Sequence, residues 1–388
     1  MSLYIIVWLF VCVMSIKEAV TVEKAVKPRI EFWLCFLILT MMLVLRYGQG
    51  TDYFGYSDNY YKISDVAITF PEYESYGEAV HGELGYNLLC NIFRVLHIPF
   101  EVLIAVISIA QMGLMLTFYR RYKIDCAFAV LLSIPTLYMT YFMSGLRQGL
   151  IIAVFLGVLF PLLENRHYVG YLIGVLICVS FHTVAVVFLL LPVAQKLLRI
   201  DILQILVLLA WLIGILLTTP EGQMIVKAAR ISSLDFYLSQ SNVSVMAVAE
   251  RLIFLGIISW LYIKLIKNGK CSETFKLAYM CYLVTMALYG GLLWNDLIAS
   301  RTAAVMRFVE IYLLVYATKQ MRRGTRYLVV IFLVAFQSFM FFKNVNTAIL
   351  EGGYRPGVTA LYYPYVSIFD EARISEYRVI PNQYTTFS

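Results

Sequence analysis

The stretch of sequence that decides the fold is residues 168–195, which read YVGYLIGVLICVSFHTVAVVFLLLPVAQ. A single histidine, His182, interrupts this otherwise strongly apolar run. A helix that spans a membrane needs roughly 20 consecutive apolar residues, so the run is either one long helix or two short helices that meet at His182. The choice determines the side of the membrane on which every later loop lies.

The composition places the whole chain in a membrane. Hydrophobic residues make up 61% of the 388 residues and charged residues only 14%, whereas about a quarter of the residues of a soluble domain are charged. The seven cysteines show no CxxC and no paired spacing, so we expect no disulfide framework and no zinc site. We predict an all-α, polytopic membrane protein with a single integral membrane domain over residues 1–388.

Ten further apolar runs are long enough for membrane helices. They are residues 2–16, 30–45, 98–118, 125–142, 146–163, 203–219, 250–266, 277–293, 301–317 and 327–342.

Positive charge decides between the two arrangements of residues 168–195, because cytoplasmic loops carry an excess of Lys and Arg. Basic clusters at 17–29, 120–123, 264–276 and 319–326 fall on one side only if residues 168–195 cross the membrane twice. We therefore predict a hairpin there, about twelve membrane segments, and both termini outside. The formal net charge of +7 is then mainly a topology signal, and it gives no indication of a nucleic-acid partner.

Five cationic or potentially cationic groups are not explained by this topology. Taken singly, each arginine can be an interfacial side chain that reaches lipid phosphates. The histidine can be a core residue whose ring nitrogens are hydrogen-bonded within the protein. Together they fall near the outer face, where they predict a site for a doubly anionic group, because Arg binds phosphate through two parallel hydrogen bonds. The anionic substrate expected at an outer leaflet is a lipid-linked diphosphate. The five are Arg46, Arg147, His182, Arg301 and Arg307.

Three outer segments are long enough to cap such a site: the loops 46–97 and 220–249 and the tail 343–388. The first is rich in tyrosine and carboxylates, which suits either sugar binding or an aromatic belt at the interface. Within it, residues 84–96 have apolar side chains at helical spacing, which predicts an interfacial helix.

Three short motifs follow one another along the first half of the chain: Arg46 with Gly50-Thr51-Asp52-Tyr53 and Tyr56, then Gly145-Leu146-Arg147-Gln148, then Phe181-His182-Thr183. Their order resembles the EpsG family of Wzy-type polysaccharide polymerases. The C-terminal half resembles the family more weakly, through Arg301 or Arg307 and the ending Tyr363-Pro364-Tyr365.

This resemblance implies a multi-pass enzyme of the bacterial inner membrane with a GT-C-like architecture and periplasmic loops. Its donor and acceptor are oligosaccharide repeat units linked to undecaprenyl diphosphate, which is released at each transfer. A chain-length regulator is a further candidate partner, and the product is an O-antigen, a capsule or an exopolysaccharide. No cofactor is implied, and since no DxD motif or tight carboxylate pair stands out, we do not expect metal dependence.

The mechanism we expect is an inverting displacement in which arginines stabilise the charge that builds on the leaving diphosphate. Arg147 and Arg307 are the first candidates for this role, with Arg46 and Arg301 behind them. His182 is the candidate base, and Asp52 competes with it. The alternative role for His182 is a contact with phosphate. Supporting roles are expected for Tyr53, Tyr56 and Gln148 as sugar-binding residues and for Glu310 as an ion-pair partner of Arg307.

Three other functions remain open. A flippase for lipid-linked oligosaccharides also binds diphosphate, but we expect it to carry charge along a path through both leaflets. An O-antigen ligase shares the arginines and differs in its acceptor. A membrane acyltransferase can use a single histidine, yet its thioester donor arrives from the cytoplasm, whereas His182 is predicted outside.

Overall fold

The computed structural model describes residues 2–21, 30–69, 83–228 and 244–380. The described chain contains helices and two isolated β-bridges but no strand, which confirms the all-α prediction. It separates into two compact units. Unit 1 comprises residues 1–157, 180–183 and 321–388, and unit 2 comprises residues 158–179 and 184–320.

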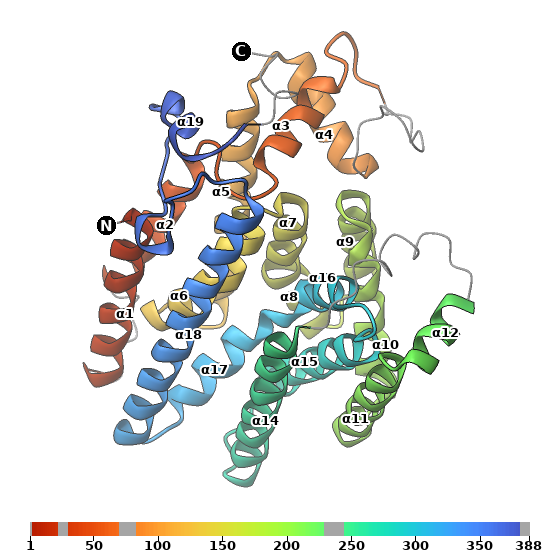
Figure 1. Cartoon of the computed structure of the whole chain (residues 1–388). Coiled ribbons are helices and arrows are strands. Elements are labelled where there is room, and N and C mark those ends of the chain that lie inside the picture. The colour runs from red at the N-terminus through yellow and green to blue at the C-terminus, as the bar shows by residue number, and fades with distance from the viewer. Residues whose placement is uncertain (1, 22–29, 70–82, 229–243, 381–388) are drawn as a thin grey trace. The chain divides into compact units, whose positions relative to one another are not determined.

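Unit 1 is built from long apolar helices with shorter helices beyond one end of them (Figure 1). Helix α18 shows why the long helices form, because its buried residues lie three or four positions apart on one stripe and apolar side chains such as Phe332 and Phe339 remain exposed on the outside. The elements are α1 (Leu3–Thr21), α2 (Ile30–Val44), α3 (Tyr53–Lys62), α4 (Leu84–Val95), α5 (Phe100–Arg121), α6 (Ala127–Ser133), the π-helix η1 (Ile134–Phe142), α7 (Leu146–Val154), α18 (Arg323–Glu351), the 3₁₀ turns η5 (Ala360–Tyr362) and η6 (Glu371–Arg373), and α19 (Ile374–Tyr377). A second π-helix, η2 (Phe155–Leu159), continues α7 across the boundary between the units.

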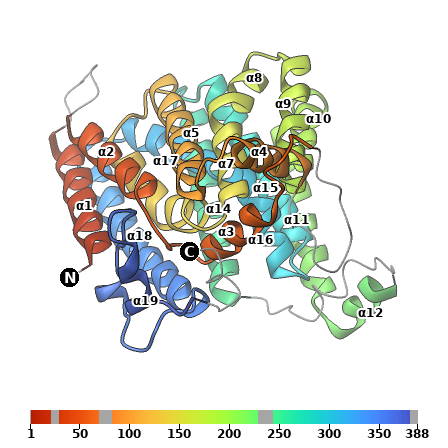
Figure 2. The ribbon, with the colours of Figure 1, turned by 90° about the horizontal axis from the view of Figure 1, so that it is seen from above.

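Viewed from above, α1 lies beside α2 and α18 (Figure 2). The C-terminal tail also pairs with the chain after α2, through an antiparallel bridge between Arg46 and Ser367. The segment that follows α2 is therefore held between the tail and the helices of unit 1.

Unit 2 is organised around one almost fully buried helix, α15 (Glu273–Gly291). Helices α10, α11, α14, α16 and α17 all pack against it. The crossing of α11 and α15 requires glycine, because a Cβ on Gly214 would lie 1.7 Å from the carbonyl oxygen of Gly290. The other elements are α8 (Phe160–Glu164), α9 (Tyr168–Phe181), the 3₁₀ helix η3 (Thr183–Leu189), α10 (Leu190–Leu197), α11 (Ile200–Leu217), α12 (Pro220–Ala228), α14 (Val245–Lys267), α16 (Asp296–Arg307) and α17 (Val309–Lys319).

The hairpin at residues 168–195 is confirmed, with His182 at its apex. Helix α9 ends at Phe181 and η3 begins at Thr183. The Tyr171 hydroxyl donates to the Phe188 carbonyl at 2.8 Å, and the Tyr168 hydroxyl donates to the Gln195 side chain at 3.2 Å. The second pair lies farther from His182 along the chain than the first pair on both arms, so the two arms run antiparallel. That each arm crosses the membrane stays a prediction.

Within the described ranges, five helical segments are long and apolar enough to cross a membrane, and they support a helical membrane protein. They are Phe100–Arg121, Leu146–Glu164, Ile200–Leu217, Val245–Lys267 and Arg323–Glu351. Four shorter apolar segments, among them Ile30–Val44 and Ala127–Phe142, lie where membrane helices were predicted. About twelve crossings and a GT-C-like architecture stay predictions.

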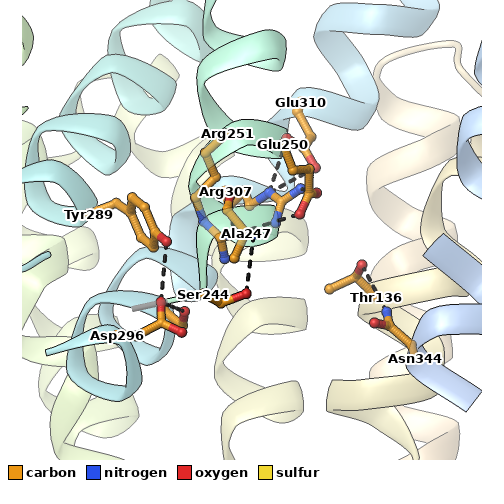
Figure 3. Close-up of polar contacts among 11 residues, drawn as sticks. Thr136, Ser244, Ala247, Glu250, Arg251, Tyr289, Asp296, Arg307, Glu310 and Asn344 are labelled. Atoms are coloured by element: carbon orange, nitrogen blue, oxygen red, sulfur yellow. Dashed lines mark hydrogen bonds and ion pairs between the residues drawn. The ribbon is translucent and has the colours of Figure 1, made fainter. Parts of the chain in front are cut away.

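Two predicted boundaries are wrong. The last apolar helix does not end at 342 but continues to Glu351, since its polar residues pack on η1: Asn344 Nδ2 donates to the Pro135 carbonyl at 2.6 Å and lies 3.4 Å from Thr136 Oγ1 (Figure 3). The predicted helix 301–317 is interrupted at Phe308, directly after the ion-paired Arg307. Parts of the predicted outer segments and of the first basic cluster, namely residues 70–82, 229–243, 381–388 and 22–29, lie outside the described residues.

Candidate functional site

Two side chains predicted from the sequence, Arg147 and His182, meet in unit 1 at the carboxylate of Glu83. Glu83 was not predicted, and it directly precedes α4. Arg147 Nη1 donates to Glu83 Oε2. His182 Nδ1 lies 2.8 Å from Glu83 Oε1, and the Thr183 N–H donates to the same oxygen at 3.2 Å. The side chains of Arg147, Glu83 and His182 are 23%, 13% and 17% exposed, so the group, called here the Glu83 cluster, is partly open to its surroundings.

The charge state of Glu83 fixes the tautomer of His182. Burial alone would raise the pKa of the Glu83 carboxyl, but the hydrogen bond with His182, the charges of Arg147 and His182 and the Thr183 amide together lower the pKa to about 2. An ionised carboxylate can only accept hydrogen bonds, so His182 must carry a proton on Nδ1. In the neutral imidazole Nε2 is then the basic nitrogen.

The start of helix α7 places the Arg147 guanidinium close to two aromatic rings. Helix α7 begins at Leu146, immediately after the π-helix η1 and Gly145, so Arg147 lies in its first turn. Its guanidinium lies 5.7 Å from the ring centre of Tyr56 and 5.6 Å from that of Tyr86, within the range of cation–π attraction. Arg147 Nε has no hydrogen-bond partner among the described residues.

Arg147 also lies in the wall of a pocket of about 660 Å³ in unit 1. This pocket, called here the α3 pocket, is lined by residues of the 51–62 segment, by Arg147, and by residues at the end of α18 and in the tail. Asp52 and Tyr56 belong to the lining, so the first two motifs of the sequence share one cavity.

The backbone of residues 48–51 brings those motifs together. Gly50 has φ +92°, and a Cβ there would lie 2.2 Å from the Met143 carbonyl oxygen, so only glycine allows this approach. The Thr51 N–H donates to Ser144 Oγ at 3.1 Å. The loop therefore rests on the chain just before Arg147.

Arg378 closes the same region from the tail. Its guanidinium donates to the carbonyls of Gly48 and Gly50 at 2.8 Å each, to that of Thr51 at 2.9 Å, and to that of Gly352. The side chain is buried, so it holds the tail against the 48–51 loop.

The other residues predicted in unit 1 have different surroundings. The exposed side chain of Asp52 accepts a hydrogen bond from Thr51 Oγ1 at 2.9 Å. Tyr53 and Gln148 are buried and lie outside the lining of the α3 pocket; the ring of Tyr53 packs against that of Phe100 at 5.4 Å. Sugar contact by these two residues stays a prediction.

Arg46 is 1% exposed. Its guanidinium donates to the Leu43 carbonyl, to Ser108 Oγ at 3.0 Å and to the Phe142 carbonyl at 3.2 Å. It thereby ties the end of α2 to α5 and η1. This geometry gives Arg46 a structural role, and its contact with a diphosphate stays an untested prediction.

Arg307 lies in a second ionic group, in unit 2 (Figure 3). Its Nη2 donates to Glu250, and its Nε donates to Glu310 at 3.2 Å, the partner expected from their spacing. Arg251 Nη1 lies 3.6 Å from Glu250, and its guanidinium lies 4.2 Å from the ring centre of Tyr289. The four charged side chains are at most 10% exposed; together they are called the Arg307 cluster.

Arg301 is exposed on α16. It belongs to unit 2 with Arg307, whereas Arg46, Arg147 and His182 belong to unit 1. The convergence of all five on one site therefore stays a prediction. Among the described residues, no group of three His, Cys, Asp or Glu side chains could hold a metal ion.

Sequence reasoning missed Glu83, Glu250, Arg251 and Arg378. A signal for the carboxylates was present, because an arginine or histidine in apolar sequence needs a partner to be buried. Glu83 stands directly before the amphipathic run 84–96, and Glu250 and Arg251 stand at the head of a predicted membrane helix. Arg378 had no such signal, since its partners are backbone carbonyls.

Comparison with known proteins gives one match. The sequence model of the EpsG family matches residues 29–367, a range that includes Arg46, Asp52, Arg147, His182 and Arg307. No curated protein matches the chain, and no solved structure matches it.

Proposed function

Since the chain belongs to the EpsG family, a family of Wzy-like polymerases, we propose that it polymerises undecaprenyl-diphosphate-linked oligosaccharide repeat units at the outer face of the bacterial inner membrane. The growing glycan is the donor, an incoming repeat unit is the acceptor, and undecaprenyl diphosphate is released. The family supports polymer synthesis, whereas the lipid donor and the orientation are parts of this proposal.

The observation that carries the proposal is the Glu83 cluster. One ionised carboxylate orients both a cation in the wall of the α3 pocket and a histidine whose Nε2 is basic. Glycosyl transfer from a diphosphate needs these two groups: a cation for the leaving oxygen and a base for the attacking hydroxyl.

The reaction we propose is an inverting displacement. The acceptor hydroxyl attacks the anomeric carbon of the donor while the bond from that carbon to the diphosphate oxygen breaks. The electron pair leaves with the diphosphate, whose growing charge is stabilised by Arg147, and the hydroxyl proton passes to His182 Nε2. Because Glu83 is already bound to His182, the imidazolium that forms is stabilised without movement of either side chain.

Asp52 remains the competing base. It lines the α3 pocket with Arg147, and its carboxylate accepts a hydrogen bond from Thr51. His182→Ala and Asp52→Asn separate the two assignments. If His182 is the base, the first variant abolishes polymer and the second retains it; the opposite pattern assigns the base to Asp52.

The direct test is elongation by the purified protein, supplied with its lipid-diphosphate repeat unit and no nucleotide sugar. A ladder of lengthened glycans is expected on gels, and Arg147→Ala should remove it. Arg199→Ala is the matched control, because the Arg199 side chain is 80% exposed and its ion-pair partner is the neighbouring Asp201. Substrate that changes leaflet in liposomes without elongation would instead indicate a flippase, and one transfer to a different acceptor would indicate a ligase.

A further inference from the structure

The α3 pocket has a charge pattern that bears on which sugar it can hold. Its lining contains three cationic side chains, Lys62, Arg147 and Arg378, and three carboxylates, Asp52, Asp58 and Glu351. By number alone, the charges of this lining cancel. The partners of each group show that two of the carboxylates are more open than the cations.

Each of the three cations is held by a group of the protein itself. Lys62 Nζ lies 2.7 Å from Asp58 Oδ2. Arg147 is bound to Glu83, and the Arg378 guanidinium donates to four backbone carbonyls. Lys62 and Arg147 are therefore each paired with a carboxylate, and the donors of Arg378 point to backbone carbonyls.

Two of the carboxylates are more open. Asp52 accepts a hydrogen bond from the neutral hydroxyl of Thr51, and Glu351 has no ion pair among the described residues. Both side chains are exposed. Glu351 is also the last residue of α18, where the helix dipole disfavours negative charge, so helix stability does not explain its presence.

The remaining lining suits a carbohydrate. Tyr56 and Phe54 offer aromatic side chains, Asn59 offers an amide, and Gly55 leaves open space beside them. The volume of about 660 Å³ lies within the range of roughly 300–1,000 Å³ found for ligand pockets. Carboxylates accept hydrogen bonds from sugar hydroxyls and pair with ammonium groups, but they repel uronate and phosphate groups.

We infer that the α3 pocket binds one sugar of the repeat unit and selects a neutral or amino-bearing sugar over an acidic one, through Asp52 and Glu351. The inference rests on the proposed function, because it defines the substrate class of the same site. It also restricts where the diphosphate binds: against Arg147, at the edge of the pocket, and not beside the two open carboxylates.

The test measures binding of three soluble trisaccharides to the full-length protein in nanodiscs by calorimetry. The probes are the trimers of glucosamine, of N-acetylglucosamine and of galacturonic acid. The glucosamine trimer should bind about fivefold more tightly than the N-acetylated trimer, as expected for one partly screened charge contact, and the galacturonic acid trimer should bind most weakly. The ratio of the affinities for the glucosamine trimer and the N-acetylated trimer should fall towards one as the salt concentration is raised.

Glu351→Gln and Asp52→Asn should each reduce the preference for the glucosamine trimer. Glu376→Gln is the matched control, because this carboxylate is 60% exposed on α19 and lies outside the pocket lining. The inference is overturned if the galacturonic acid trimer binds as tightly as the neutral one, if no trimer binds, or if both pocket variants keep the wild-type ratio. The salt dependence of the wild type tests the same point should a variant fail to fold.

The elongation assay keeps this result separate from the proposed function. A glycan ladder without the predicted order of binding would refute the pocket assignment alone. The predicted order of binding in a protein that never elongates its substrate would refute the polymerase and retain a sugar site.

Discussion

Arg147 in unit 1 and Arg307 in unit 2 both bind carboxylates, but the two groups differ in exposure and in balance. The Arg307 cluster contains two arginines and two glutamates that are at most 10% exposed. The Glu83 cluster gives a single carboxylate to both an arginine and a histidine, and its side chains are 13–23% exposed. Its arginine also faces the α3 pocket.

We expect this difference to separate a cation that stabilises the fold from one that acts on a ligand. Both arginines stood out equally in the sequence, because each interrupts an apolar run. In a buried cluster of equal numbers of cations and carboxylates, the charged groups are already paired with one another and not with a substrate. Breaking one of these ion pairs to bind a substrate leaves a buried charge without compensation. A group with one shared carboxylate and an adjoining cavity can add a ligand without first breaking.

The largest effect is expected for Arg307→Met. Removing this guanidinium leaves Glu310 buried without its ion-pair partner and leaves Glu250 with the more distant Arg251, at 3.6 Å. This should cost roughly 3–5 kcal/mol of unfolding free energy. A sharp loss of thermal stability in detergent is the expected measurement, and the double variant Arg307→Met, Glu250→Gln should recover part of it. If Arg307→Met keeps wild-type stability and loses polymer, Arg307 belongs to the catalytic machinery and the contrast with Arg147 disappears.

Arg147→Ala should lower the elongation rate by about 10²–10³-fold, the usual effect of removing one preorganised donor from a developing negative charge. Its melting temperature should change much less than that of Arg307→Met. Arg147→Lys should recover only part of the rate, because an ammonium group cannot reproduce the planar fork. Full activity of Arg147→Ala would remove this residue from the mechanism.

The pKa of Glu83 makes a prediction about stability and pH. Its folded pKa of about 2 lies below the ordinary value of 4.5, so the ionised carboxylate stabilises the fold above pH 4.5, and this contribution is lost as the pH falls towards 2. After allowance for solvent screening at this partly exposed group, the contribution is on the order of 1–2 kcal/mol. The difference in melting temperature between wild type and Glu83→Gln should therefore be constant from pH 8 to about 5 and shrink below that. A difference that vanishes between pH 7 and 6 would contradict an ionised Glu83.

Glu83→Gln should also reduce elongation by about 10–100-fold, as is usual when a partner that orients a functional histidine is lost. A glutamine can still contact Arg147 and His182, but it does not stabilise the imidazolium. The elongation assay used for Arg147→Ala measures this loss. Wild-type elongation by Glu83→Gln would remove this carboxylate from the mechanism.

The sequence predicts those features that depend on local pattern. The break at His182 and most helix positions follow from hydrophobic runs and basic loops, which are properties of neighbouring residues. The partners of the key cations do not follow, because Glu83 and Arg147 are 64 residues apart and Glu250 and Arg307 are 57 residues apart. A pattern search recognises that a charge in apolar sequence needs a partner, and only tertiary contacts choose which one.

Arg378 has a consequence for the order in which the protein is made. The carbonyls of Gly48 and Gly50 that it binds lie 330 and 328 residues earlier in the chain. During synthesis the 48–51 loop emerges long before the arginine that holds it, so the α3 pocket cannot take its final shape until nearly the whole described chain has left the ribosome. A partly inserted nascent chain therefore lacks the finished sugar site, and lipid-linked substrate meets a completed pocket only after translation has passed residue 378.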